Sequence, residues 1–285
     1  MVTAVQSVEE ILAAVKDIPP LPAIIPRVMN VLNDPDSTVV ELSEVLGSDQ
    51  AIASKLLRLS NSAFYGYAKH IGTIQDAVVL LGFKTIKGLI YALSLYSSFN
   101  DDVGGYMMEK GELWRHSLTA AFVSRTIATR AKAGNPDQAF VCGLMHDIGK
   151  TILGEFVGRN SGEVMRYVQK ENMNFVEAEE HVFGVGHPEI GARVCEKWNL
   201  PTELLEAVRY HHAPSNCTSG NPLVPVVHIA DAVCLMLGVG IGLDGFCYEL
   251  DDRAMSAIGK DYSFLDDIVK VSGTQLLDID TLLNI

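Results

Sequence analysis

A histidine and an aspartate stand next to each other at His146-Asp147, in the run from Leu144 to Lys150. The run lies late in an apolar pattern that predicts an amphipathic helix, so both side chains could leave the helix toward one cleft. Imidazole nitrogen and carboxylate oxygen are both ligands of divalent transition metals. His-Asp pairs are common, so the pair gains weight only from the residues that accompany it.

Further histidines and an aspartate precede and follow this pair. The full set of candidate metal ligands is His116, His146, Asp147, His187, His211, His212 and Asp231, and it contains five of the eight histidines of the chain. Asp231 is a charged residue inside an otherwise apolar helical pattern, where a buried carboxylate needs a partner such as a metal ion. The set therefore predicts a metal site.

Three of the histidines also allow a simpler interpretation. His187 precedes Pro188, where we expect a helix to begin, so it is either a ligand or a capping or surface group. His211-His212 end a predicted helix, and the helix dipole alone favours histidine there. The histidines outside the set are assigned to structural or surface roles: His70, His181 and His228.

Two charged residues near the candidate ligands are also ambiguous. Glu112 lies four residues before His116, on the same helix face, and is either a further ligand or a first-turn acid; the second interpretation is favoured. Lys150 lies one turn beyond His146, and either orients a phosphate near the metal or is a solvated lysine near a helix end.

Helical periodicity predicts an all-α fold. Apolar residues between 86 and 93 recur at helical spacing, which predicts one buried stripe. Thr38 and Glu41 are spaced as a capping box, Gly82 is expected just after a helix end, and Pro201 is expected in a first helical turn. No segment shows the sustained alternation of a strand.

Loop-like composition suggests where the chain divides. Residues 100–105 separate an early helical block from the block with the histidines, and residues 213–222 form a longer connection after His211-His212. We therefore expect an N-terminal helical lobe, residues 1–105, and a metal-binding helical lobe, residues 106–285, packed together.

Composition excludes several classes of function. The formal charge of the 285-residue chain is −13, and no run of Lys or Arg stands out, which argues against nucleic-acid or anionic-membrane partners. The five cysteines are scattered and odd in number, as in reduced proteins of the cytosol. Without a continuous apolar span or a signal peptide at the start of this sequence, we expect a cytoplasmic protein.

The order of these residues resembles known families. His116, His146-Asp147 and Asp231 resemble the HD superfamily of metal-dependent phosphohydrolases, and the further histidines are similar to the binuclear pattern of the HD-GYP cyclic-dinucleotide phosphodiesterases. From about Ile18 to Leu237, the chain resembles the HDOD (HD-related output domain) family of bacterial signalling proteins. The runs that carry this last resemblance are residues 18–22, 34–35, 56–66 and 77–82.

The resemblance implies a multi-helix HD-type bundle with an N-terminal helical lobe, and a phosphohydrolase of unknown substrate. Asp147 would bridge two divalent metals, iron or manganese with zinc as an alternative, and Lys150 would orient the phosphate. His116, His146 and Asp231 would complete one metal site, and His187, His211 and His212 the other. The alternative is a non-catalytic regulatory module with a structural or vestigial metal site. Its partners would be signalling proteins, or a phosphorylated small molecule or nucleotide, and it could form oligomers.

The residues after His211-His212 generate a prediction about substrate. In the resembled HD-GYP enzymes, an acid and a glycine-rich stretch ending in Gly-Tyr-Pro follow the paired histidines, whereas residues 213–222 form a proline-bearing loop without a basic side chain. Since a substrate must be held with its phosphate across the metals, we expect metal-loaded protein not to hydrolyse cyclic di-GMP at a useful rate. Robust turnover that His146→Ala abolishes would contradict this expectation.

Overall fold

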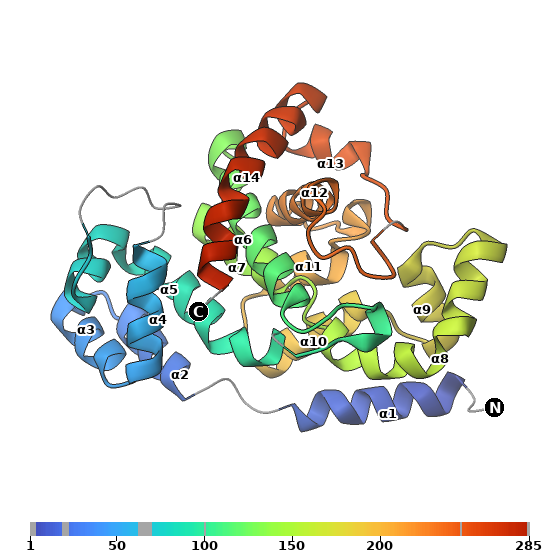
Figure 1. The fold of residues 1–285 in the computed structure, drawn as a ribbon, viewed down its shortest axis with the longest axis horizontal. Helices are drawn as coiled ribbons and strands as arrows, with labels where there is room; N and C mark the ends of the chain where they lie inside the picture. Colours follow the sequence, from blue (N-terminus) through green and yellow to red (C-terminus); the bar gives the residue numbers. More distant parts are fainter. Residues whose placement is uncertain (1–3, 19–22, 62–69, 100, 246, 284–285) are drawn as a thin grey trace. The chain divides into compact units, whose positions relative to one another are not determined.

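The fold is shown in Figure 1 as a computed structural model. The structure describes residues 4–18, 23–61, 70–99, 101–245 and 247–283. These residues form helices, turns and loops and no strand, apart from one isolated bridge between Val103 and Met108. The prediction of an all-α fold is confirmed.

The chain forms two compact units. The larger unit comprises residues 1–19 and 98–273, and the smaller unit comprises residues 20–97 and 274–285. The expected lobes were residues 1–105 and 106–285; in the structure the first helix groups with the larger unit and residues 274–285 group with the smaller unit.

The smaller unit is built from helices with clear sequence signals. Its helices are α2 (Ile24–Asn33), α3 (Val39–Gly47), α4 (Gln50–Ser60) and most of α5 (Ile74–Phe99). The predicted capping box opens α3: the Thr38 hydroxyl accepts the Glu41 N–H at 3.2 Å, and the Glu41 carboxylate accepts the Thr38 N–H at 2.8 Å. The predicted apolar stripe of α5 is buried, as expected: Ile86, Leu89, Ile90 and Leu93.

Helix α5 is interrupted at Gly82. This residue has φ 75° and ψ 160°, a backbone conformation that glycine tolerates, so a glycine ends the first helical segment as predicted. The span Ile74–Leu95 is long and apolar enough to cross a membrane by length and composition, and 59% of its most apolar window is buried. A core helix of a soluble protein has the same features.

Asn61, directly after α4, makes hydrogen bonds to Leu57 and Ile71. Its side-chain amide donates to the carbonyls of Leu57 and Ile71, both at 2.8 Å, and its carbonyl oxygen accepts the Ile71 N–H at 2.7 Å. The predicted tight bend at Ser62, Tyr65 and Gly66 lies outside the described residues. For Asn61, the contacts support a structural role.

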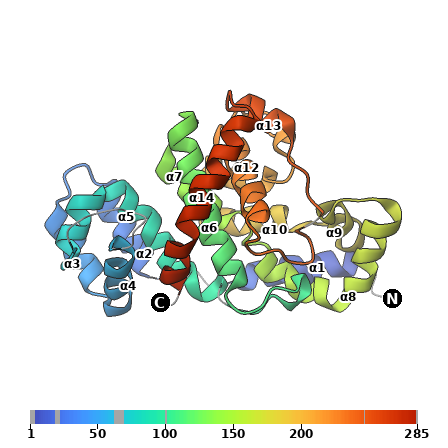
Figure 2. The ribbon, with the colours of Figure 1, turned by 45° about the horizontal axis from the view of Figure 1, so that its top comes forward.

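The larger unit is a bundle in which α6 packs on α7 and α12, and α11 packs on α10 and α12 (Figures 1 and 2). Its helices are α1 (Ala4–Asp17), α6 (Glu112–Ala131), α7 (Pro136–Met145), α8 (Lys150–Glu171), α9 (Phe175–Phe183), α10 (His187–Lys197), α11 (Thr202–Tyr210), α12 (Leu223–Met236), α13 (Asp252–Ala257) and the start of α14 (Tyr262–Leu283). Short 3₁₀ turns, η2 (Gly104–Tyr106) and η3 (Pro214–Asn216), complete it.

Helix α1 packs against α8, α9 and α10. Its Ile11 and Val15 side chains are buried, and the Lys197 ammonium donates to the carbonyl oxygen of Ile18 at 2.7 Å. Apolar burial and the capping of a helix end by a lysine therefore attach the N-terminal segment to the larger unit.

Three helix boundaries differ from those expected. His146-Asp147 lies in the turn between α7 and α8 and not within a helix, since α7 ends at Met145. His187 is the first residue of α10, with Gly186 as its N-cap, and Pro201 is itself the N-cap of α11. Helix ends are set by local contacts that periodicity does not report.

The α7–α8 turn lies in close contact with the start of α10. A Cβ atom added to Gly149 would lie 1.9 Å from the carbonyl oxygen of His187. Only a residue without a side chain allows this approach, and the approach brings Asp147 and His187 into the same region of the bundle.

This contact predicts that Gly149→Ala lowers the free energy of unfolding by about 1–3 kcal/mol, because the methyl group must push two main chains apart. Gly162, within α8, is the matched control, because a Cβ atom added there would have no neighbouring atom within 4 Å. Gly162→Ala should stabilise the protein by up to about 1 kcal/mol. Urea denaturation measures both changes. Equal effects of the two substitutions would show that the main chains at Gly149 can separate freely.

Candidate metal centre

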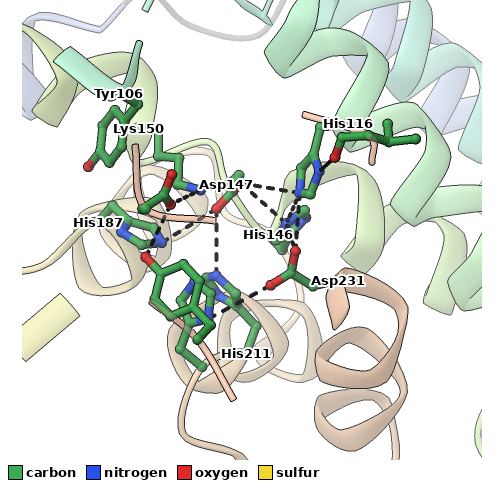
Figure 3. Close-up of polar contacts among 12 residues, drawn as sticks. Tyr106, His116, His146, Asp147, Lys150, His187, His211 and Asp231 are labelled. Carbon is green, nitrogen blue, oxygen red and sulfur yellow. Dashed lines mark hydrogen bonds and ion pairs between the residues drawn. The ribbon is translucent and has the colours of Figure 1, made fainter. Parts of the chain in front are cut away.

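All seven candidate ligands lie together inside the larger unit. Figure 3 shows most of them around Asp147: His116, His146, His187, His211 and Asp231. They come from five places in the fold: His116 from α6, His146 and Asp147 from the α7–α8 turn, His187 from the start of α10, His211 and His212 from the residues after α11, and Asp231 from α12. The segments are far apart in the sequence, and helix packing brings them together.

The two carboxylate oxygens of Asp147 face different imidazoles. Oδ2 lies 3.5 Å from Nε2 of His116 and 3.4 Å from Nε2 of His146. Oδ1 lies 3.4 Å from Nε2 of His187 and 3.6 Å from Nε2 of His211. Asp147 is therefore the residue shared by two sets of nitrogen donors.

Asp231 also lies between the two sets. Its Oδ1 is 3.2 Å from Nε2 of His116 and 3.8 Å from Nε2 of His146, while its Oδ2 is 3.8 Å from Nδ1 of His212. Two groups of ligand atoms lie within 4.8 Å of one another: His116, His146 and Asp231 in the first group, and Asp147, His187, His211 and His212 in the second.

The ligand imidazoles are oriented by hydrogen bonds on their far side. Main-chain carbonyls accept Nδ1–H of three rings: Val239 from His116 at 3.0 Å, Gly143 from His146 at 2.7 Å, and Val208 from His211 at 2.6 Å. A carbonyl can only accept, so each Nδ1 carries the hydrogen and each neutral ring turns the lone pair of Nε2 toward the centre. This is the tautomer that metal binding needs.

Glu179 orients the fourth ring. Its carboxylate, fully buried in α9, accepts both Nδ1–H of His187 at 2.9 Å and the His187 N–H at 2.8 Å, and the Tyr106 hydroxyl donates to it at 2.5 Å. Sequence reasoning missed Glu179 and Tyr106. The sequence does indicate that Glu179 is buried, because it is four residues from both Phe175 and Phe183 and therefore lies on the apolar face of α9.

The metal ligands proposed from the sequence fit a divalent ion. Within the described part of the chain, four buried atoms of the second group make no hydrogen bond: Asp147 Oδ1, His187 Nε2, His211 Nε2 and His212 Nε2. Unpaired buried polar atoms are rare in proteins because they lose hydration without replacement. In the first group, Nε2 of His116 and Nε2 of His146 face each other at 3.1 Å. A cation would satisfy both groups.

Every buried Asp, Glu or Lys in the described residues belongs to this region. The region holds four buried carboxylates but one buried ammonium, that of Lys150, which contacts two of them; the carboxylates belong to Asp147, Glu179, Asp231 and Asp244. Ionised groups are stable in a protein interior only when they are paired. The excess of negative charge therefore favours cation binding.

The pKa values follow from burial and these neighbours. Burial by itself would raise the pKa of Asp147, but Lys150 and His146 outweigh it and hold that pKa well below its usual range. Burial would lower the pKa of His187, yet Glu179 and Asp147 raise it to about 9, whereas burial lowers the pKa of His211 to about 4. Without metal, His187 therefore gains a proton more readily than His211.

Lys150 is buried between two carboxylates. Its ammonium lies 2.7 Å from Asp147 Oδ2 and 2.7 Å from Asp244 Oδ2, and these carboxylates outweigh burial to raise the pKa of Lys150. The solvated alternative for Lys150 is therefore wrong, while its role toward phosphate stays a prediction. Asp244 was not expected from the sequence.

Two residues left ambiguous or assigned to structural roles lie outside the ligand groups. Glu112 is exposed at the start of α6, where its carboxylate accepts the Glu109 N–H at 2.7 Å, as expected of a first-turn acid. His228 donates from Nδ1 to the His211 carbonyl at 2.7 Å and accepts the Asp251 N–H at Nε2 at 2.8 Å. Its role is structural, as predicted.

A model of the HDOD domain family matches residues 18–214, and the chain therefore belongs to the HDOD family. The match covers residues 20–97 of the smaller unit and most of the candidate ligands, with Asp231 beyond its end.

Solved structures share the fold. An HDOD domain protein of unknown function from Geobacter sulfurreducens is 27% identical, with a TM-score of 0.78 over 99% of this chain and 97% of that chain. A protein from Shewanella amazonensis, described as a candidate phosphohydrolase, is 23% identical with a TM-score of 0.74, covering 96% of this chain and 97% of that chain. At this identity the second likeness shows the fold alone.

A curated relative is longer than this chain. An uncharacterised protein from Treponema pallidum is 25% identical over 226 residues, which are 76% of this chain but only 42% of the relative. The chain thus spans less than half the length of that protein.

The contacts of Glu179 predict a selective loss of metal. Glu179→Gln replaces the carboxylate that orients His187, so we expect metal affinity at the second group to fall by about 10- to 100-fold while the first group keeps its ion. Metal titration followed by elemental analysis measures this. Glu180→Gln, at the exposed neighbouring position of α9, is the matched control. Equal affinity in both variants would mean that Glu179 does not support a ligand.

Proposed function

We propose that this protein binds two divalent metal ions around Asp147 and hydrolyses a phosphate ester there. The observation that carries the proposal is the position of Asp147, whose two oxygens each face a separate pair of imidazole nitrogens at 3.4–3.6 Å. Mixed nitrogen and carboxylate ligands suit iron or manganese, with zinc as an alternative.

The chain's own residues divide between the two ions. His116, His146 and Asp231 would hold the first ion and His187, His211 and His212 the second, with Asp147 shared. Two such ions would lower the pKa of water and neutralise the charge that develops on a reacting phosphate. Lys150, buried beside Asp147, would supply the positive charge that orients the phosphate.

A second function, a regulatory module with a structural metal site, is favoured by the burial of the centre. The side chains of the seven candidate ligands are at most 8% exposed, which leaves little room for a substrate in this conformation. Under either function, the proposed partners are signalling proteins or a phosphorylated small molecule, and the proposed location is the cytoplasm.

The two functions differ in measurable ways. The proposed two-metal hydrolysis predicts about two metal ions per chain. It also predicts turnover of at least one compound in a panel of phosphate mono- and diesters, tested on iron- and manganese-loaded protein. A regulatory module would hold metal without turnover of any compound. The panel therefore decides between them once metal content is known.

Both proposed functions depend on metal binding by Asp147, so removal of its carboxylate tests both. We expect Asp147→Ala to lose both ions, because the second group loses its carboxylate and the first group keeps only that of Asp231 beside two neutral imidazoles. With free metal at a hundred times Kd, each lost site removes about 2.7 kcal/mol of stability, so the melting temperature should fall. Asp266→Ala, an exposed acid of α14, is the control. Full metal content and an unchanged melting temperature in Asp147→Ala would refute the assignment.

A further inference from the structure

The chain that follows α12 folds back over the metal centre, and we call residues 238–245 and 247–250 the cap segment. Val239 accepts Nδ1–H of His116 at 3.0 Å, and the Leu243 N–H donates to the carbonyl oxygen of Tyr106 at 2.6 Å. The cap segment is therefore hydrogen-bonded both to a ligand residue and to the residue that supports Glu179.

The cap segment also packs closely on the ligands. Gly240 has φ 64°, and a Cβ atom there would lie 2.4 Å from Cβ of His116. The Tyr248 ring stacks on the His212 imidazole, with centroids 3.7 Å apart and an angle of 16° between planes. Two sides of the centre are thus covered by this one segment.

Asp244 is a buried, charged residue of the cap segment and contacts Lys150 beside the metal centre. Its carboxylate is 2% exposed, and its Oδ2 accepts from the Lys150 ammonium at 2.7 Å and from the Tyr248 hydroxyl at 3.1 Å. Lys150 lies in turn 2.7 Å from Oδ2 of Asp147. The Asp244 carboxylate therefore lies beside Lys150, the ammonium that the proposed function assigns to a phosphate.

Asp244 is not a member of either group of candidate ligand atoms. Lys150 does not require Asp244 as a counter-ion, because Asp147 already pairs with Lys150. The additional carboxylate instead adds negative charge to a buried region that already holds Asp147, Glu179 and Asp231. A group with these properties matches a phosphate in charge sign and in hydrogen-bond chemistry.

We propose that Asp244 is a tethered anion that fills the phosphate position at Lys150, so that the cap segment keeps the metal centre closed until a phosphate-bearing ligand displaces it. This inference rests on the proposed function and adds its regulation. A ligand must then compete with an intramolecular carboxylate. Its apparent affinity equals its intrinsic affinity multiplied by the fraction of protein that is open.

The first experiment measures binding of inorganic phosphate to manganese-loaded protein by calorimetry. Asp244→Asn keeps the shape and removes the charge, so it should bind phosphate about tenfold or more tightly than the unmodified protein, with unchanged metal content. Glu249→Gln, an exposed acid in the same segment, is the matched control and should leave the affinity unchanged. Tyr248→Phe keeps the ring on His212 and removes the hydroxyl, so it should give a smaller gain.

The second experiment measures hydrogen exchange of the main-chain amides of Leu243 and Cys247, whose N–H groups donate to Tyr106 and Asp244 carbonyls. In metal-loaded unmodified protein, phosphate should raise exchange in the cap segment several-fold. In Asp244→Asn, exchange should be raised without phosphate, in metal-free protein as well. Glu249→Gln should behave like the unmodified protein.

Equal phosphate affinity and equal exchange in Asp244→Asn and Glu249→Gln would overturn the inference and leave Asp244 as a structural ion pair. Loss of metal in Asp244→Asn would overturn it too, since Asp244 would then be a ligand. Absence of metal from every variant would instead refute the two-metal proposal, and the exchange of metal-free protein would still show whether Asp244 holds the segment closed.

Discussion

The interaction on which the rest of the larger unit depends is the burial of the Asp147 carboxylate. A carboxylate with 1% exposure is stable only when its charge is compensated. Here compensation comes from the Lys150 ammonium, from the neighbouring His146, and from imidazoles carried by other helices. The helices α6, α8, α10 and α12 must therefore bring their polar residues to one point while their apolar faces form the surrounding core. This requirement explains why all buried Asp, Glu and Lys residues of the described chain gather there.

Two sets of contacts hold the metal-binding side chains around Asp147 in place. Main-chain carbonyls and Glu179 accept from Nδ1 of four imidazoles, which leaves Nε2 available, and close contact of main chains at Gly149 joins the α7–α8 turn to α10. Such support reduces the reorganisation needed when a cation binds. The cap segment, in contrast, opposes ligand binding, because it closes the metal centre with groups that a ligand must displace.

The set of His116, His146-Asp147, His187, His211-His212 and Asp231 was enough to predict which residues would lie together, because all of them carry metal-binding side chains. Taken singly, His187 and His211-His212 also suited helix ends. Glu179, Asp244 and Tyr248 were not predicted. Each acts through a partner distant in the sequence, such as Tyr106 with Glu179 or Lys150 with Asp244, and neither periodicity nor a local motif encodes such a pair.

The sequence by itself determined the helical class, through apolar spacing, the Thr38 capping box and the break at Gly82, because these depend on residues within one or two helical turns of each other. It also determined the family, through long runs of matching residues. Only the tertiary structure decided that α1 joins the larger unit, that Asp147 presents one oxygen to each group of histidines, and that Asp244 lies on Lys150. These outcomes depend on how whole helices pack, and side chains many residues apart meet only after that packing is complete.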